Sequence, residues 1–271
     1  MDITVIIPVY PNLRLLYRSL ESLQRQTFKN FDVVVVVDNK GNFEEEERKI
    51  IKQFSSMDIK FINHGKNRST LQARLTGIDN ITGKYVFFMD HDDEVEDCIL
   101  YNAYHQAEKE NADIVGIHLS TIVEKKFIIE GIDILYYINW KVDKQEAPMV
   151  PYLYRSDLVR KVKEMMNVPE DLYIIYLEDL YIGVCIMSQA KKVVENYQNG
   201  TYTYNHDNPM STLTYRKMDV IKKNEQNKQG VQVRQLINDF LIRNGCDKRS
   251  IGYEVNNLGH YILKHNKKII R

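Results

Sequence analysis

The stretch from Gly83 to Val95 reads GKYVFFMDHDDEV, and it joins an apolar run directly to a cluster of acids. The apolar part has the length and composition of a buried strand. The polar residues that follow it are Asp90, His91, Asp92 and Asp93. Burying one unpaired carboxylate costs several kcal/mol, and neighbouring carboxylates also repel one another. The sequence therefore predicts that a positively charged group meets these acids at the end of the strand.

Segments of strand and helix character alternate around this stretch. Apolar runs of strand length occupy residues 3–10, 31–38, 59–64, 84–90 and 113–120. Helical patterns occupy residues 13–26, 42–56, 70–81 and 99–112. This alternation indicates an α/β fold with a mostly parallel sheet flanked by helices. Ligands of such sheets bind beyond the carboxyl ends of the strands, which is where Asp38 and the Asp90–Asp93 cluster fall.

The second half of the chain is less regular. Residues 153–162 have the pattern of a strand end that leads into a helix, and residues 176–190 that of a helix opening with two acids. From residue 215 onward the chain reads as polar amphipathic helices in which Lys and Arg outnumber Asp and Glu. The expected apolar stripe of this part consists of Val231, Leu236, Phe240 and Leu241. We therefore expect a basic helical C-terminal extension over 215–271.

The charge balance and the cysteines limit which partners and which cellular compartment are expected. The chain has 271 residues, with 37 Lys and Arg against 37 Asp and Glu, which predicts no nucleic-acid partner. Cys98, Cys185 and Cys246 are scattered and odd in number, which fits a reducing compartment. No apolar run approaches the length of a membrane span, and the N-terminus lacks the basic region of a signal peptide. We expect a cytoplasmic protein.

Several motifs together resemble the family 2 glycosyltransferases, which have the nucleotide-sugar-dependent GT-A fold. ITVIIPVY and FDVVVVVD resemble the opening of that family, and NRSTLQARLTGI with TGKYVFFMDHDD resembles its central signature. LYRSDLV and LEDLYIG are similar to its acceptor-side motifs. The resemblance implies a GT-A domain over 1–214, with a nucleotide-sugar half at about 1–120 and an acceptor half at about 121–214.

The resemblance assigns a donor site and a metal site. Asp90-His91-Asp92 matches the DXD motif, so Asp92 and Asp90 would hold Mn²⁺ or Mg²⁺ against the diphosphate of a UDP-sugar. GT-A enzymes often add a histidine ligand, here His206. The implied donor-binding residues are Pro8, Val9, Tyr10, Asp38, Asn67, Arg74, Asp90, His91 and Asp92.

The chain departs from the family at three positions. Asn39 stands where a second acid is usual, Ser69 where glycine is usual, and Leu75 where asparagine is usual. Asp93 is interpreted as a cap of the following helix.

The acceptor side follows from the same resemblance. Asp179 matches the family's catalytic base in an inverting transfer, and Glu178 would orient the base or the acceptor. Two acids in the first turn of a helix are also favoured by the helix dipole alone, so that interpretation stays open. Aromatic residues that crowd this side are Trp140, Tyr152, Tyr154, Tyr173 and Tyr176. The expected acceptor is a hydroxyl of a glycan or a lipid-linked saccharide.

Other functions are consistent with the same residues. A GT-A binding or assembly protein without turnover would explain the departures from the family pattern. A nucleotidyltransferase would also combine a parallel sheet with metal-binding acids, but PVYPNLR is not a glycine-rich phosphate loop. The basic extension suggests peripheral contact with the inner face of an anionic membrane, and equally a solvated helical pair or a dimerisation element.

Overall fold

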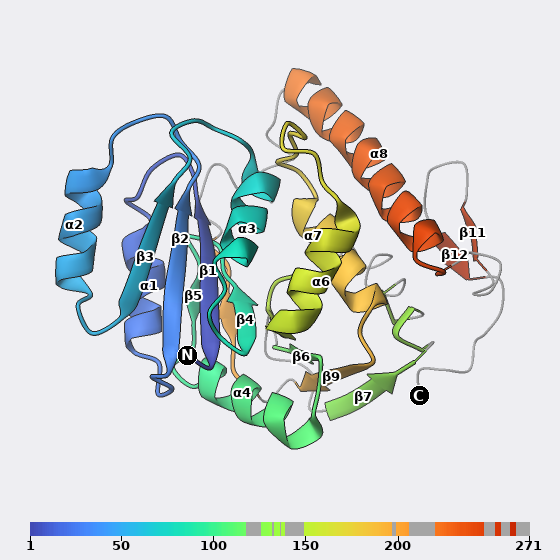
Figure 1. Ribbon diagram of the computed structural model, residues 1–271, viewed down its shortest axis with the longest axis horizontal. Helices are drawn as coiled ribbons and strands as arrows, with labels where there is room; N and C mark the ends of the chain where they lie inside the picture. Colours follow the sequence, from blue (N-terminus) through green and yellow to red (C-terminus); the bar gives the residue numbers. More distant parts are fainter. Residues whose placement is uncertain are drawn as a thin grey trace.

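The computed structural model of the chain describes residues 1–117, 126–131, 133–135, 137–138, 149–196, 199–205, 220–246, 253–255 and 261–263. A mixed sheet with helices on both faces forms the centre of the molecule (Figure 1). In spatial order its strands are β3 (Asp58–Asn63), β2 (Phe31–Val37), β1 (Ile3–Val9), β4 (Tyr85–Phe88), β8 (Tyr152–Arg155), β6 (Ile114–Gly116), β9 (Lys192–Asn196) and β7 (Lys126–Glu130).

The four strands on one side of the sheet are parallel, as the alternation of strands and helices predicts. β1 pairs in register with β2 and β4, and β2 pairs with β3. β1, β2 and β4 are buried along their whole length, which explains why their sequences are nearly continuous apolar runs, interrupted only by Thr4 and Asp32, whose side chains hydrogen-bond each other. Their carboxyl ends therefore meet at one edge, and this edge receives the residues that follow each strand.

The other side of the sheet is mixed. β8 is antiparallel to both β4 and β6, and β7 is antiparallel to β9. The acceptor-side motif that contains β8 thus places its strand directly beside β4, in the middle of the sheet. The sequence patterns predicted the strand and its following helix, but neither its direction nor the strands β7 and β9.

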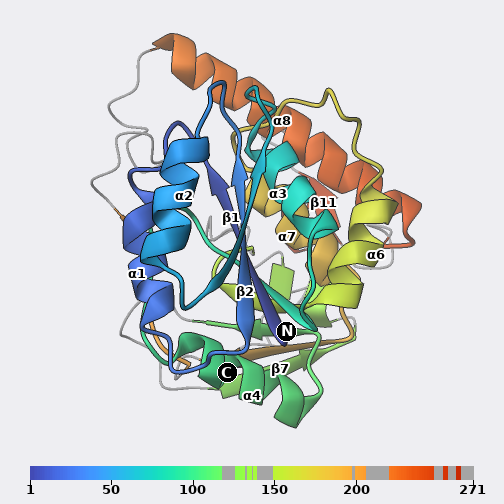
Figure 2. The same ribbon diagram turned by 60° about the vertical axis from the view of Figure 1, so that its left-hand side comes forward.

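The helices lie on both faces of the sheet. They are α1 (Leu16–Gln24), α2 (Glu44–Gln53), α3 (Thr70–Asp79), α4 (Ile99–Glu110), α6 (Ser156–Met166), α7 (Glu178–Ser188) and α8 (Val220–Arg243). Figure 2 shows α1 and α2 on one face and α3, α6 and α7 on the other. α3 packs on β1 and β2 and also contacts α6 and α7. It therefore joins the parallel half of the sheet to the helix that opens with Glu178.

The C-terminal part differs from the sequence expectation in two respects: one residue of the expected apolar stripe is exposed, and residues 253–255 and 261–263, expected to be helical, form the strands β11 and β12. Residues 220–243 form a single helix, α8, which packs on α7. Val231, placed in the expected apolar stripe, is 63% exposed, whereas Val233, Ile237 and Phe240 are buried. Phe240 belongs to the expected stripe, and Leu236 and Leu241 of that stripe also pack against the core, so the prediction is wrong only at Val231. The predicted boundary at residue 214 and most residues after 246 lie outside the described part of the chain.

Two short antiparallel pairs complete the described structure. β5 (Glu94–Val95) pairs with β10 (Tyr202–Thr203), immediately after the acidic cluster, and β11 (Tyr253–Val255) pairs with β12 (Tyr261–Leu263). Within the described residues, every helix is too short or too polar to cross a bilayer.

Candidate active site

The acidic cluster lies in the turn between β4 and β5. Phe88 ends the strand, and the following turn is tied to α1 because the Ser19 hydroxyl donates hydrogen bonds to the backbone oxygens of Asp93, at 2.8 Å, and Asp90, at 3.3 Å. The side chain of Asp90 is 39% exposed, whereas Asp92 is buried. The two carboxylates of the predicted DXD motif thus differ in their access to solvent.

Arg74 is the positive charge that meets this cluster. It lies on α3 with a side chain that is only 3% exposed, and its Nη2 donates a hydrogen bond of 2.7 Å to Asp90 Oδ1. Its Nε lies 3.6 Å from Glu178 Oε1. Burial by itself lowers the pKa of Arg74, but the carboxylates of Asp90, Glu178 and Asp179 raise it above its usual value. Arg74 therefore joins the acids after β4 to the acids of α7.

Glu178 and Asp179 open α7. Leu177, the residue before them, has φ 61° and ψ 22°, a left-handed conformation that is uncommon for leucine and that turns the chain sharply into the helix. Burial and then repulsion from Asp179 raise the pKa of Glu178 to about 7, against the opposing effect of Arg74. Burial also raises the pKa of Asp179, again opposed by Arg74. Buried, partly compensated carboxylates of this kind suit proton transfer near neutral pH.

Asp38 follows β2 and is almost fully buried. Its Oδ1 accepts the backbone N–H of Arg68 at 2.8 Å and lies 2.7 Å from His64 Nδ1. Its Oδ2 accepts the N–H of Ser69 at 2.9 Å. Asp38 therefore fixes the segment that leads into α3, and contact with a nucleotide base stays a prediction. Sequence reasoning missed His64, whose Nε2 lies 2.9 Å from Thr76 Oγ1.

Ser69 occupies the position at which the family usually has glycine. Its φ of 97° and ψ of 157° lie in a region that glycine adopts and other residues avoid. Ser69 also caps α3, accepting the N–H of Gln72 at 3.5 Å. The departure from the family pattern thus has a local cost in backbone strain, and the hydrogen bond to Asp38 holds the strained residue in place.

The remaining predicted donor residues lie at the same edge of the sheet. Pro8 and Val9 are buried at the end of β1, and Tyr10 after them is 39% exposed. Asn67 Oδ1 accepts the N–H of Ser69 at 3.1 Å.

The tyrosines expected on the acceptor side differ in exposure. Tyr152 and Tyr154 are buried in the sheet, whereas Tyr173 is 45% exposed.

Asp93 has a different role from the predicted helix cap. The residue that precedes α4 is Cys98, so the capping prediction is wrong. Asp93 Oδ2 instead accepts the Tyr202 hydroxyl at 2.7 Å, and its Oδ1 accepts the N–H of Asn205 at 2.8 Å. Burial and the charge of Asp90 raise the pKa of Asp93 to about 8, although both hydrogen bonds oppose this rise. Asp93 therefore ties the acidic turn to the segment that precedes His206.

The residues present are compatible with a hard divalent cation. Asp90 and Asp92 supply carboxylate oxygens, and the ordinary protein share of a Mg²⁺ site is one or two carboxylates beside substrate phosphates. Among the described residues no three His, Cys, Asp or Glu side chains converge on one point. His206 and Trp140 lie outside the described part. His91 Nδ1 is 4.0 Å from Asp92 Oδ1, and burial lowers the pKa of His91.

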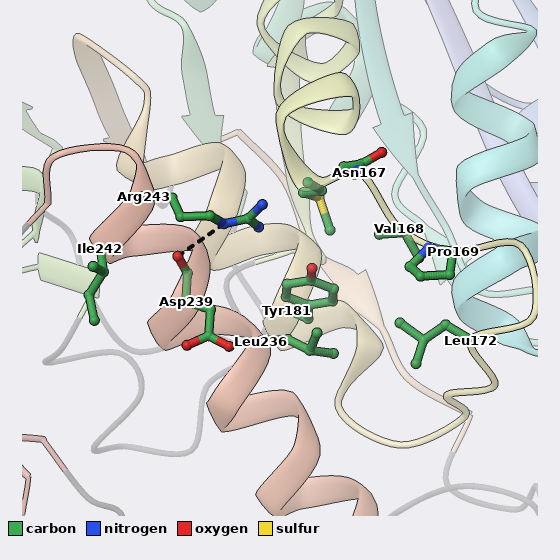
Figure 3. A pocket seen from close by; sticks show the side chains of 10 residues that line it. Asn167, Val168, Pro169, Leu172, Tyr181, Leu236, Asp239, Ile242 and Arg243 are labelled. Atoms are coloured by element: carbon green, nitrogen blue, oxygen red, sulfur yellow. Dashed lines mark hydrogen bonds between the residues drawn. The ribbon is translucent and has the colours of Figure 1, made fainter.

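A cavity of about 380 Å³ lies on the other side of α7, against α8 (Figure 3). Its lining combines apolar side chains of the segment after α6 with Tyr181, Leu236, Asp239, Ile242 and Arg243. Arg243 Nε donates to the backbone oxygen of Asp239 at 3.3 Å. None of the predicted site residues lines this cavity, so it is distinct from the acidic cluster.

The comparison with known families agrees with the motifs. The model of glycosyl transferase family 2 matches residues 4–154. Glycosyltransferase GlyA of Streptococcus pneumoniae is 38% identical over 120 residues, which is 44% of this chain and 17% of that protein. The poly(ribitol-phosphate) beta-N-acetylglucosaminyltransferase TarP of Staphylococcus aureus is 29% identical over 115 residues, 42% of this chain and 35% of TarP. The match thus covers a minor part of both relatives.

Solved structures share the fold across nearly the whole chain. The structure of S. aureus TarS 1–349 in complex with UDP-GlcNAc matches with a TM-score of 0.63 and 19% identity, covering 93% of this chain and 75% of that one. The mannosyltransferase PcManGT from Pyrobaculum calidifontis, in complex with GDP-Man and Mn²⁺, matches with a TM-score of 0.59 and 15% identity, covering 91% of this chain and 64% of that one. At these identities the likeness shows a shared GT-A fold.

Proposed function

The chain belongs to glycosyl transferase family 2, and from that membership we propose that it is an inverting glycosyltransferase that uses a nucleotide-sugar donor. The acceptor is a hydroxyl group of a glycan or glycoconjugate in bacterial surface polysaccharide synthesis. The single observation that carries the proposal is the bridge made by Arg74, which brings Asp90 and the acids of α7 to one place.

Asp179 is the proposed base. It takes the proton from the acceptor hydroxyl while that oxygen forms a bond to the anomeric carbon of the donor. The bond between this carbon and the diphosphate breaks at the same time, and the nucleoside diphosphate leaves with the electron pair. One displacement inverts the anomeric centre. A raised pKa makes the Asp179 carboxylate a stronger base than a solvated aspartate, because burial disfavours its charged form.

Glu178 and Arg74 position the reacting groups. Arg74 is buried and bonded to Asp90, so we assign it to orienting that carboxylate and Glu178 rather than to contacting the base of the donor. Because its charge lowers the pKa of both α7 acids, it also keeps Asp179 able to ionise near neutral pH. Positioning of this kind, together with fixed charges, supplies much of the rate in displacement reactions.

Asp92 and Asp90 are the proposed ligands of Mn²⁺ or Mg²⁺, and His206 stays a predicted third ligand. When bound, the cation neutralises the charge that develops on the departing diphosphate. A UDP-sugar is the proposed donor, and the UDP-GlcNAc complex of the fold neighbour TarS supports this choice. The Mn²⁺ in the structure of PcManGT supports the proposed cation.

The free state of all three cysteines supports a cytoplasmic location.

The proposal is tested by donor turnover with water as the acceptor. The protein is incubated with UDP-GlcNAc and Mn²⁺, and released UDP is measured beside the Asp179→Asn and Asp92→Asn variants. We expect slow, metal-dependent release by the wild type and a loss in both variants. Binding of UDP without any release from a panel of nucleotide sugars, with or without added acceptor glycans, would instead identify a binding protein.

A further inference from the structure

The segment 167–177 between α6 and α7, here called the α6–α7 loop, is fixed to the N-terminus of α3. Gln72 Nε2 donates hydrogen bonds to the backbone oxygens of Pro169, at 2.8 Å, and Leu172, at 3.2 Å. The N–H of Leu71 donates to the backbone oxygen of Ile174 at 3.2 Å. The loop therefore lies beside the segment that Asp38 holds in place, although it belongs to the acceptor half in sequence.

The same loop is fixed from its other side by α8. The N–H of Ile175 donates to Gln229 Oε1 at 3.0 Å. Val168, Pro169 and Leu172 line the cavity against α8 (Figure 3). The residues on both sides of Tyr173 are thus held by hydrogen bonds or packing, which gives its backbone a defined position.

Tyr173 nevertheless keeps an exposed side chain. It is 45% exposed, and Tyr10 at the end of β1 is 39% exposed. The side chain of Asn67 lies near the Tyr173 phenol, and Asn67 Oδ1 accepts the N–H of Ser69. Partial burial, with the nearby Tyr10 phenol and Asp38 carboxylate, raises the pKa of Tyr173. Two exposed aromatic rings and an amide therefore gather at the edge where β1 and β2 end.

We propose that Tyr173 is a base-recognition residue of the donor site, contacting the nucleobase of the nucleoside diphosphate together with Tyr10 and Asn67. Exposed aromatic rings on a fixed backbone stack on bases at little cost in conformational entropy, and the phenol and amide reach polar base edges. The inference rests on the proposed function and extends it, because it gives a donor-side role to a residue of the acceptor half.

The test measures UDP binding by calorimetry to the wild type and to Tyr173→Ala, Tyr173→Phe and Ile175→Ala. Ile175 is the matched control, since it is in the same loop and 50% exposed. We expect Tyr173→Ala to weaken UDP binding by about tenfold or more, the usual effect of removing one stacking ring. Tyr173→Phe retains the ring and should lose about threefold or less, and Ile175→Ala should bind like the wild type.

Two further ligands separate base recognition from other causes. Relative to the wild type, Tyr173→Ala should bind uridine and UDP more weakly by the same factor. Its affinity for inorganic pyrophosphate should equal that of the wild type. Wild-type affinity of Tyr173→Ala for both UDP and uridine would overturn the inference and leave the proposed function intact. Equal losses for UDP and pyrophosphate would overturn it as well. If the wild type binds none of UDP, GDP, CDP and ADP, the proposed function itself fails, and the inference fails with it.

Discussion

Arg74 Nη2 lies 2.7 Å from Asp90 Oδ1, so a buried guanidinium on α3 neutralises the first acid of the cluster after β4. The same guanidinium faces Glu178 at 3.6 Å. Two acidic motifs that are far apart in the sequence are thus held together by one positive charge. Arg74 thus compensates the charge of Asp90 at the end of a buried strand, whereas the buried carboxylate of Asp93 accepts hydrogen bonds from Tyr202 and Asn205.

Replacement of Arg74 by methionine should destabilise the protein in a pH-dependent way. Removing one partner of a buried ion pair costs about 3–5 kcal/mol. Without Arg74 the folded-state pKa values of Glu178 and Asp179 rise further. A carboxyl group with a raised folded-state pKa stabilises the fold at low pH, and this stabilisation is lost as the pH rises through that value. Urea unfolding should therefore show a larger loss at pH 8 than at pH 5.

The control for this variant is Lys84→Met, which breaks the half-exposed pair of Lys84 with Glu108. A pair of this kind contributes about 0–1 kcal/mol, so the control should stay near the wild type. Equal destabilisation of Arg74→Met at pH 5 and pH 8 would contradict the proposed electrostatic role.

Asp179→Asn should lower kcat by at least about 100-fold, because the amide cannot accept the acceptor proton. UDP affinity should stay unchanged. In the wild type, kcat/KM should rise with pH over an acidic limb that lies above the ordinary pKa of aspartate, since the raised pKa of Asp179 delays its ionisation. Asp157→Asn is the matched control, as Asp157 is in the first turn of α6. Equal kcat for both variants would favour the helix-dipole interpretation.

Ser69→Gly should stabilise the fold. Glycine adopts φ 97° and ψ 157° without the strain of about 1–3 kcal/mol that other residues incur, and replacing a Ser cap by Gly costs only a few tenths of a kcal/mol. The expected gain in the free energy of unfolding is about 1 kcal/mol. Ser69→Ala, which keeps the strain and loses the cap, should instead be destabilised. A glycine variant less stable than the alanine variant would show that the backbone there is not strained.

Tyr202→Phe should destabilise the turn that carries the acids. The Tyr202 hydroxyl donates to Asp93 and accepts the N–H of Asp90 at 3.1 Å, so its removal takes this partner from the buried Asp93 carboxylate and from the partly buried N–H of Asp90. A buried unsatisfied group costs about 1–3 kcal/mol. Tyr101→Phe is the control, since Tyr101 is 48% exposed on α4. Equal unfolding free energies of the two variants would count against the linking role of Tyr202.

The sequence predicts the parallel half of the fold well, because burial on both faces leaves a direct mark on composition. β1, β2 and β4 are nearly continuous apolar runs, and each is followed closely by a residue of the candidate site. The direction of β8 leaves no such mark. Its four residues, YLYR, fit a parallel or an antiparallel strand equally, and only pairing with β4 and β6 decides the direction.

The residues of the candidate site were also predictable only in part. The sequence could identify Asp90, Arg74 and Glu178 from motifs, but the ion pairs that join them depend on how α3 and α7 pack. The prediction for Asp93 was wrong because aspartate before a helix is a common cap, whereas its actual partners, Tyr202 and Asn205, are remote in sequence. The Val231 prediction failed similarly, since a mostly polar helix gives a weak signal of which face packs on α7.

The most direct test of the central claim, that the acids after β4 hold a divalent cation for a nucleoside diphosphate, is calorimetric titration of UDP with and without Mn²⁺. The account predicts that Mn²⁺ strengthens UDP binding to the wild type by at least about tenfold, equivalent to about 1.4 kcal/mol, and has no such effect on Asp92→Asn. Equal affinities with and without Mn²⁺ in the wild type, or an undiminished metal effect in Asp92→Asn, would contradict it.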